Sequence, residues 1–155
     1  MSFVIRALPA APFAALFALS DDELRHRLAV RCVVDRSPGF PCRVSLCDAA
    51  VGETVLLVHH EHQPASTPYR AGHAIYVREG AVEARPGVGE VPEVLARRLL
   101  SVRAFDAAGT MRDADVVDGR ALAPVVERLF ADERVEYLHL HNAKPGCYAA
   151  RVERA

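Results

Sequence analysis

Histidine is the residue type in this chain best suited to chemistry, and its seven copies are unevenly spaced. Five of them lie in two groups, each at the end of an expected strand. The groups are His59, His60 and His62, followed by His139 and His141. Side chains alternate along a strand, so His139 and His141 share one face with Tyr137, while the intervening leucines share the other. The imidazoles of that face are within reach of one common ligand.

Imidazole is a common ligand of zinc and similar metals, and a catalytic zinc site uses three protein ligands with one position left for water. We therefore predict that His62, His139 and His141 bind a divalent metal such as zinc, provided that their strands are neighbours. Glu61 would then be a general base or a fourth ligand. The alternative is that the histidines are structural, because the spacing His-x-His can occur on any strand face.

A cysteine near the second histidine group is a further candidate. Cys147 follows His141 and Asn142 across a Pro-Gly turn, which could return the thiol to the imidazole. A thiol beside an imidazole can ionise and act as a nucleophile, which makes Cys147 a candidate catalytic residue together with Glu61. The alternative is a small buried apolar side chain, the usual role of a free cysteine.

Polar side chains near the loop between residues 62 and 72 point to ligand binding. Tyr69 and Arg70 end this proline-bounded segment, and loops of that kind often carry binding residues. Arg70 and Arg151 could hold an anion through paired guanidinium hydrogen bonds. The alternative is a solvated loop arginine, since arginine is the default basic residue of this chain. The expected ligand-binding residues are Tyr69, Arg70, Tyr137, Asn142 and Arg151.

Composition limits the class of protein. A chain of 155 residues with 51% hydrophobic and 25% charged residues is typical of one globular domain, here residues 1–155. The formal net charge of −1 argues against nucleic acid as a partner. No apolar run is long enough to span a membrane, and Pro9 and Pro12 interrupt the only stretch that resembles a secretory signal. We therefore expect a cytoplasmic protein with a small-molecule partner and its cysteines as thiols; the sequence does not indicate an oligomeric state.

The elements that must position these residues follow from local patterns. A capping box predicts a helix from Ser20 to about Leu28, Pro12 and Pro92 each open a short helix, and an apolar stripe predicts a helix over about 120–130. Residues 62–72 are expected to be loop. Strands are expected at residues 2–6, 29–35, 42–46, 54–60, 73–78, 99–105, 111–117, 135–141 and 147–152. This order predicts an α+β fold: a mainly antiparallel sheet with two or three helices packed on one face.

Four blocks of the sequence, in order, resemble a known family. They are residues 37–46, 61–64, 68–70 and 139–148. Together they are similar to a family of short bacterial proteins of unknown function, the domain-of-unknown-function 1203 family. The resemblance covers nearly the whole chain and implies a single free-standing domain, but it implies no activity, metal or substrate. Position 60 is usually aromatic in that family, so the resemblance favours His62 over His60 as a ligand.

Two classes of function are compatible with these residues. The first is an enzyme with a small-ligand pocket lined by His, Arg and Tyr, acting as a metal-assisted hydrolase or transferase on a small anionic substrate. Glu61 would be its base and Arg70 would hold the substrate. The second is a non-catalytic module that binds a ligand or a protein. A metal ion at the histidines, or a strongly shifted pKa in a deep cleft there, would favour the first class, and a shallow surface with a contiguous apolar patch would favour the second.

Overall fold

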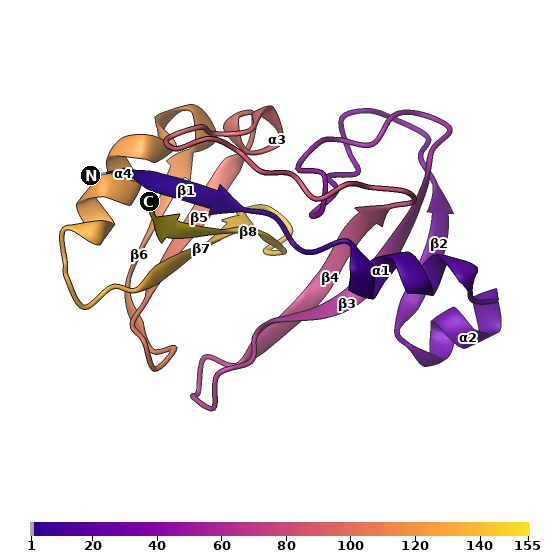
Figure 1. Cartoon of the computed structure of the whole chain (residues 1–155), viewed down its shortest axis with the longest axis horizontal. Coiled ribbons are helices and arrows are strands. Elements are labelled where there is room, and N and C mark those ends of the chain that lie inside the picture. Colours follow the sequence, from indigo (N-terminus) through magenta and orange to yellow (C-terminus); the bar gives the residue numbers. More distant parts are fainter. Residues whose placement is uncertain (1) are drawn as a thin grey trace. The chain divides into compact units, whose positions relative to one another are not determined.

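The computed structural model describes residues 2–155, which form two sheets (Figure 1). Contacts between residues divide the chain into two compact units. The first unit contains residues 2–6, 61–73 and 85–155, and the second contains residues 7–60 and 74–84. The second unit is thus inserted between segments of the first. A single domain stays a prediction, which expression of the separate units would test.

The first unit is built on a five-stranded antiparallel sheet. Its strands are β1 (Phe3–Arg6), β5 (Leu99–Phe105), β6 (Met111–Asp118), β7 (Tyr137–Asn142) and β8 (Tyr148–Arg154). Their order is β1-β8-β7-β5-β6, so β7 lies in the centre between β8 and β5. All six residues of β7 are buried, as expected for a central strand that is covered on both faces.

One face of this sheet is apolar and is covered by the helix α4 (Leu122–Phe130). Leu138 and Leu140 of β7 are fully buried on this face. Arg128 of α4 forms ion pairs with Asp113 and Asp115 of β6, which lie opposite Ala104 and Val102 of β5 and so belong to the same face. The helix α4 thus contacts β6 on this face, and its apolar stripe includes the fully buried Leu122 and Val126. The helix expected at about 120–130 is confirmed.

A glycine before α4 makes a close contact that no other residue type can reproduce. Gly119 begins the 3-10 helix η2 (Gly119–Ala121), and a Cβ atom there would lie 2.0 Å from the carbonyl oxygen of Leu95 in the short helix α3 (Glu93–Ala96). Gly119→Ala is therefore expected to lower the free energy of unfolding by about 1–3 kcal/mol, measured by urea denaturation. Gly87→Ala is the control, because its Cβ would meet only the flexible Glu90 carboxylate, at 3.3 Å. Equal effects of the two variants would contradict this account.

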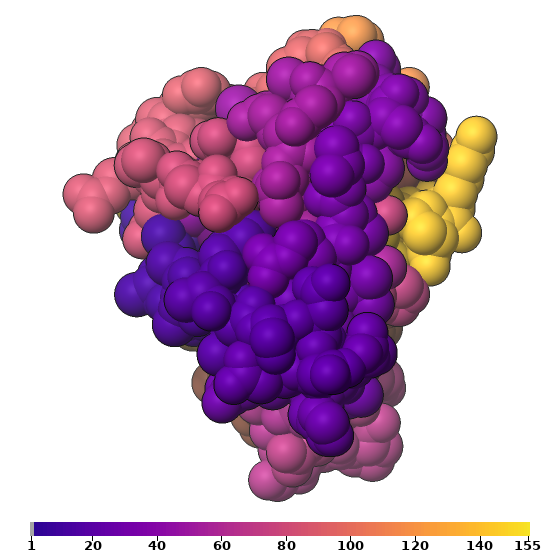
Figure 2. All heavy atoms as spheres, turned by 90° about the vertical axis from the view of Figure 1, so that its right-hand side faces the viewer, coloured from indigo at the N-terminus to yellow at the C-terminus, as the bar shows by residue number. Residues whose placement is uncertain are grey.

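The second unit contains the N-terminal helices and most of a three-stranded sheet. Its helices are α1 (Ala11–Ala14), η1 (Ala15–Ala18) and α2 (Asp21–His26). The sheet has the order β2-β3-β4, with β2 (Ala29–Val33), β3 (Thr54–Gln63) and β4 (Ala71–Arg78). The predicted capping box is confirmed, since Ser20 and Glu23 each accept a backbone N–H of the other. Indigo and purple atoms of this unit form one continuous surface in Figure 2.

The strand expected at residues 42–46 is wrong, because this segment is a turn. Cys42 forms only an isolated bridge, its N–H donates to the Cys47 carbonyl, and Leu46 has a φ of 49°. The sulfur of Cys42 accepts the backbone N–H groups of Ser45, at 3.4 Å, and of Arg78, at 3.3 Å. These contacts fold the segment around the sulfur, and an alternating sequence pattern does not reveal them.

The expected α+β fold class is confirmed, with differences in detail. Residues 2–155 form two sheets and four α-helices, where one sheet and two or three helices were expected. The loop expected at residues 62–72 is shorter, because β3 continues to Gln63 and β4 begins at Ala71. None of the helices within residues 2–155 has the length and apolar character needed to cross a membrane.

Candidate metal centre

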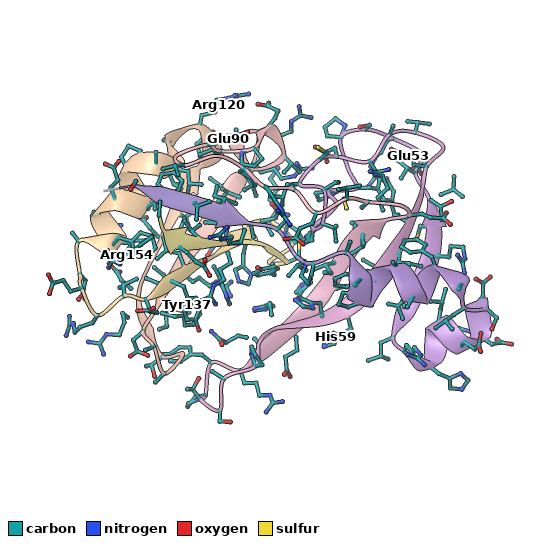
Figure 3. All side chains as sticks on the ribbon, in the orientation of Figure 1. Glu53, His59, Glu90, Arg120, Tyr137 and Arg154 are labelled. Atoms are coloured by element: carbon teal, nitrogen blue, oxygen red, sulfur yellow. The ribbon has the colours of Figure 1, made fainter. Side chains whose placement is uncertain are left out.

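The polar face of the five-stranded sheet carries His139 and His141. Both side chains lie on β7 and are buried, with exposed fractions of 3% and 1%. Their ring centroids are 6.4 Å apart, and the ring of Tyr137 lies 5.1 Å from that of His139. The predicted sharing of one face by these three residues therefore holds. Figure 3 labels Tyr137, and nitrogen-rich side chains gather beside it.

The end of β3 brings a third histidine to this pair. The ring centroid of His62 lies 4.7 Å from that of His141 and 5.8 Å from that of His139. The three side chains can each offer a ring nitrogen, and these nitrogens all lie within 4.8 Å of one another. Residues 61–73 belong to the same compact unit as β7, so the group lies within one unit. The structure thus brings together the three histidines that the sequence proposes as metal ligands.

Hydrogen bonding orients the imidazole of His141. Its Nδ1 lies 2.9 Å from the carbonyl oxygen of Gly146, so Nδ1 carries the proton and donates it to that oxygen. The Nε2 atom then holds the lone pair, and it is buried without a hydrogen-bond partner among residues 2–155. Nδ1 of His139 is also buried without a partner in that part of the chain. Buried polar atoms are nearly always paired, so these two nitrogens require an explanation.

Burial keeps both of these histidines neutral. It lowers the pKa of His139 to about 3, and the nearby imidazole of His62 and guanidinium of Arg151 lower it in the same direction. Burial also lowers the pKa of His141 to about 3, against the opposing effect of its hydrogen bond to Gly146. Neutral imidazole is the form that binds metal, so neither ligand has to lose a proton at pH 7.

Aromatic rings surround the imidazoles. Tyr148 stacks on His62 with ring centroids 5.4 Å apart and an interplanar angle of 6°, and it meets His139 edge-on at 5.2 Å. Phe105 lies 5.1 Å from His139. The hydroxyl oxygen of Tyr137 accepts a hydrogen bond of 2.8 Å from the amide of Gln63. This apolar surrounding lowers the local dielectric, which strengthens electrostatic interactions at the nitrogens.

Two arginines lie beside the histidines on the neighbouring strands. Arg103 of β5 and Arg151 of β8 are the residues paired with His139 in the sheet register. Arg151 lies 3.9 Å above the ring of Tyr137, and its Nε donates to Glu153 at 2.8 Å. Arg103 donates from Nε to the hydroxyl of Ser101 at 3.3 Å. Burial lowers the pKa of Arg103, although the group stays protonated at neutral pH.

Glu61 and Arg70 form a separate ion pair. Nε and one terminal nitrogen of Arg70 each donate to a carboxylate oxygen of Glu61, both at 3.1 Å. Both side chains are exposed, and strand alternation turns Glu61 away from the face of β3 that carries His62. The predicted base and anion-binding arginine therefore bind each other. Tyr69 is exposed and contacts Phe105 edge-on at 6.4 Å.

Asn142 and Cys147 form a structural contact at the turn between β7 and β8. The Asn142 amide donates to the sulfur of Cys147 at 3.6 Å, and its backbone N–H donates to the Cys147 carbonyl at 2.9 Å. Both side chains are buried. Since Nδ1 of His141 donates to Gly146, that nitrogen is not free to accept a proton from the thiol. A nucleophilic role for Cys147 stays a prediction.

Sequence reasoning missed Arg103, Phe105 and Tyr148. Alternation within the expected strand at residues 99–105 places Ser101, Arg103 and Phe105 on one face, which could have been noticed. Their position beside the histidines depends on β5 being the neighbour of β7, which the sequence does not indicate. Tyr148 lies opposite His141 at a register shift in the ladder, which a regular alternation does not predict.

Comparison with known proteins adds a family but no activity. The family model described as "Protein of unknown function (DUF1203)" matches residues 39–154, which is most of the chain and includes all three histidines. No curated protein and no solved structure matches the chain.

Proposed function

This chain belongs to the DUF1203 family, whose function is unknown, and we propose that its residues His62, His139 and His141 bind one divalent metal ion such as zinc. The observation that carries the proposal is the convergence of three imidazole nitrogens within 4.8 Å of one another, two of the side chains being buried. Zinc bound by histidine at its usual distance holds ligand nitrogens about 3.4 Å apart, so small side-chain rotations would close the group around an ion.

The chemical state of the ligands fits this role. Metal-bound histidines commonly donate their second ring N–H to a backbone carbonyl or a carboxylate, which sets the tautomer. His141 makes such a hydrogen bond to Gly146 and leaves Nε2 for the ion. A bound ion would also be the missing partner of the buried nitrogens of His139 and His141.

We further propose that the centre supports hydrolysis or group transfer on a small anionic substrate. A divalent ion with three protein ligands has a position left for water and supplies a nucleophile at neutral pH. Arg103, which bonds only a neutral hydroxyl, makes the surroundings positive, which favours an anion. Glu61 is not assigned the role of base here, because its carboxylate is bound by Arg70.

Metal content tests the proposal directly. Untagged protein treated with EDTA is titrated with Zn²⁺ and with Co²⁺, and bound metal is counted by mass spectrometry after dialysis. We expect one ion per chain, stabilisation against heat on metal addition, and loss of both in His62→Gln. His59→Gln is the control, because His59 lies on the same strand but is exposed and outside the group (Figure 3). Absence of metal from the wild type, or equal metal binding by both variants, would overturn the proposal.

A non-catalytic module is the second candidate, and the aromatic contacts favour it. His62 stacks on Tyr148 and could serve only as part of an aromatic core. In that case His62→Phe would keep or raise the melting temperature and no metal would bind.

The catalytic proposal has its own test. Metal-loaded wild-type protein should hydrolyse chromogenic phosphate or carboxylic esters, and His141→Gln should not.

A further inference from the structure

Arg103 is an arginine whose charge is only partly satisfied. Its side chain is half-buried, and within residues 2–155 it makes a single hydrogen bond, from Nε to the neutral hydroxyl of Ser101. No carboxylate of that part of the chain lies within ion-pair distance of it. A guanidinium has five N–H donors, and a partly desolvated charge without a counter-ion is unfavourable. An anion is the group that this side chain lacks.

The position of Arg103 relates that missing anion to the histidines. Arg103 lies directly opposite His139 in the ladder between β5 and β7, and Ser101 lies opposite His141. Side chains of directly opposite residues point to the same face, with Cβ atoms about 4.5–5.5 Å apart. The unused N–H donors of Arg103 are therefore on the face that carries the candidate ligands.

The net charge of the histidine group with its flanking arginines also favours binding of an anion. Its three histidines are accompanied by no carboxylate ligand within the described residues, so a bound divalent ion would keep its full charge of +2. Of the two flanking arginines, Arg151 is paired with Glu153, whereas Arg103 adds an uncompensated positive charge. Such a site attracts anions.

We propose that Arg103 binds an oxyanion of the substrate, a carboxylate or a phosphate group, on the polar face of the sheet beside His139 and His141. This rests on the proposed function of the same site and assigns to Arg103 the anion-binding role that the sequence suggests for Arg70. The planar guanidinium can donate two parallel hydrogen bonds to either oxyanion. Arg70 is unsuited to this role, since two of its nitrogens already bind Glu61.

Calorimetric titration with small anions tests this assignment. Co²⁺-loaded and metal-free protein are each titrated with inorganic phosphate and with acetate at constant ionic strength, and the visible spectrum of Co²⁺ gives a second readout. We expect Arg103→Gln to weaken binding of the preferred anion at least about tenfold, and Arg103→Lys to recover part of the loss. Arg70→Gln, the matched control, should stay within about twofold of the wild type. A preference for phosphate or for acetate identifies the class of oxyanion.

The outcomes separate this inference from the metal proposal. Arg103→Gln should bind Co²⁺ at least as tightly as the wild type, because it removes a positive charge near the ion; this also shows that the variant is folded. Equal anion affinities of Arg103→Gln and the wild type would overturn the role of Arg103 while leaving the metal centre intact. Failure of the wild type to bind Co²⁺ would overturn the metal centre, and titration of metal-free protein would still decide the role of Arg103. Absence of saturable anion binding by both the Co²⁺-loaded and the metal-free protein would overturn the role of Arg103.

Discussion

Between pH 6.5 and pH 5 the metal-free protein is expected to lose about 3 kcal/mol of its free energy of unfolding. The pKa values of His139 and His141 are lowered to about 3 from an ordinary value of 6.5. Above pH 6.5 both groups are neutral whether the chain is folded or unfolded. Below it the unfolded chain takes up protons that the folded chain refuses, at about 1.4 kcal/mol per pH unit for each group. Urea denaturation in EDTA at a series of pH values measures this loss.

The charged neighbours of these histidines do not cancel the effect. The imidazoles of His62 and His73 and the guanidinium groups of Arg103 and Arg151 all disfavour protonation. The hydrogen bond from His141 to the Gly146 carbonyl favours it, but burial outweighs that bond.

A single variant isolates the histidine contribution to this acid sensitivity. His139→Gln should remove about half of the slope between pH 6.5 and pH 5. Asp132 also contributes to acid sensitivity, but in a different pH range from the histidines. Its hydrogen bonds to Arg134 lower its pKa to about 2, so its effect on stability appears only in stronger acid. A stability that stays flat down to pH 5 would show that the two imidazoles are accessible to water in solution.

Replacing His139 by leucine is expected to abolish metal binding without harming the fold. Loss of one of three ligands should weaken Zn²⁺ binding at least about 100-fold. In the metal-free protein at pH 7, however, His139→Leu should raise the free energy of unfolding by about 1 kcal/mol, because a buried nitrogen without a partner is removed. Isothermal titration with Zn²⁺ and urea denaturation in EDTA measure the two effects.

His141→Leu is the informative comparison. It should also abolish metal binding, but it removes the donor to the Gly146 carbonyl together with the unpartnered Nε2. Its free energy of unfolding should therefore be about 1 kcal/mol below that of His139→Leu. A large loss of stability in His139→Leu, with Zn²⁺ affinity retained, would identify His139 as a structural residue. A lower stability of His141→Leu than of His139→Leu, with loss of metal binding in both variants, would identify two ligands of which only His141 also stabilises the fold.

Local sequence patterns were sufficient to predict several helices and the faces of a strand. The capping box of Ser20 and Glu23 predicts a helix start, because both hydrogen bonds are formed within one turn. The stripe from Leu122 to Phe130 predicts α4, because only one helical face can be buried. Strand alternation also placed His139 and His141 with Tyr137 on the face opposite the leucines. Alternation predicted a strand wrongly at residues 42–46, because the structure there depends on contacts between distant residues. The Cys42 sulfur accepts backbone N–H groups, one of them from the later strand β4.

The candidate ligands follow from the sequence, whereas their neighbours follow only from tertiary structure. Residue type and spacing identified His62, His139 and His141, since imidazole chemistry and strand alternation are local properties. Strand order is not local, and it alone placed β5 beside β7 and so Arg103 opposite His139. The pairing of Arg70 with Glu61 likewise depends on how the chain returns after β3. The sequence by itself thus determined which side chains have the chemistry to bind a metal, and the fold decided which arginine is paired with a carboxylate and which is not.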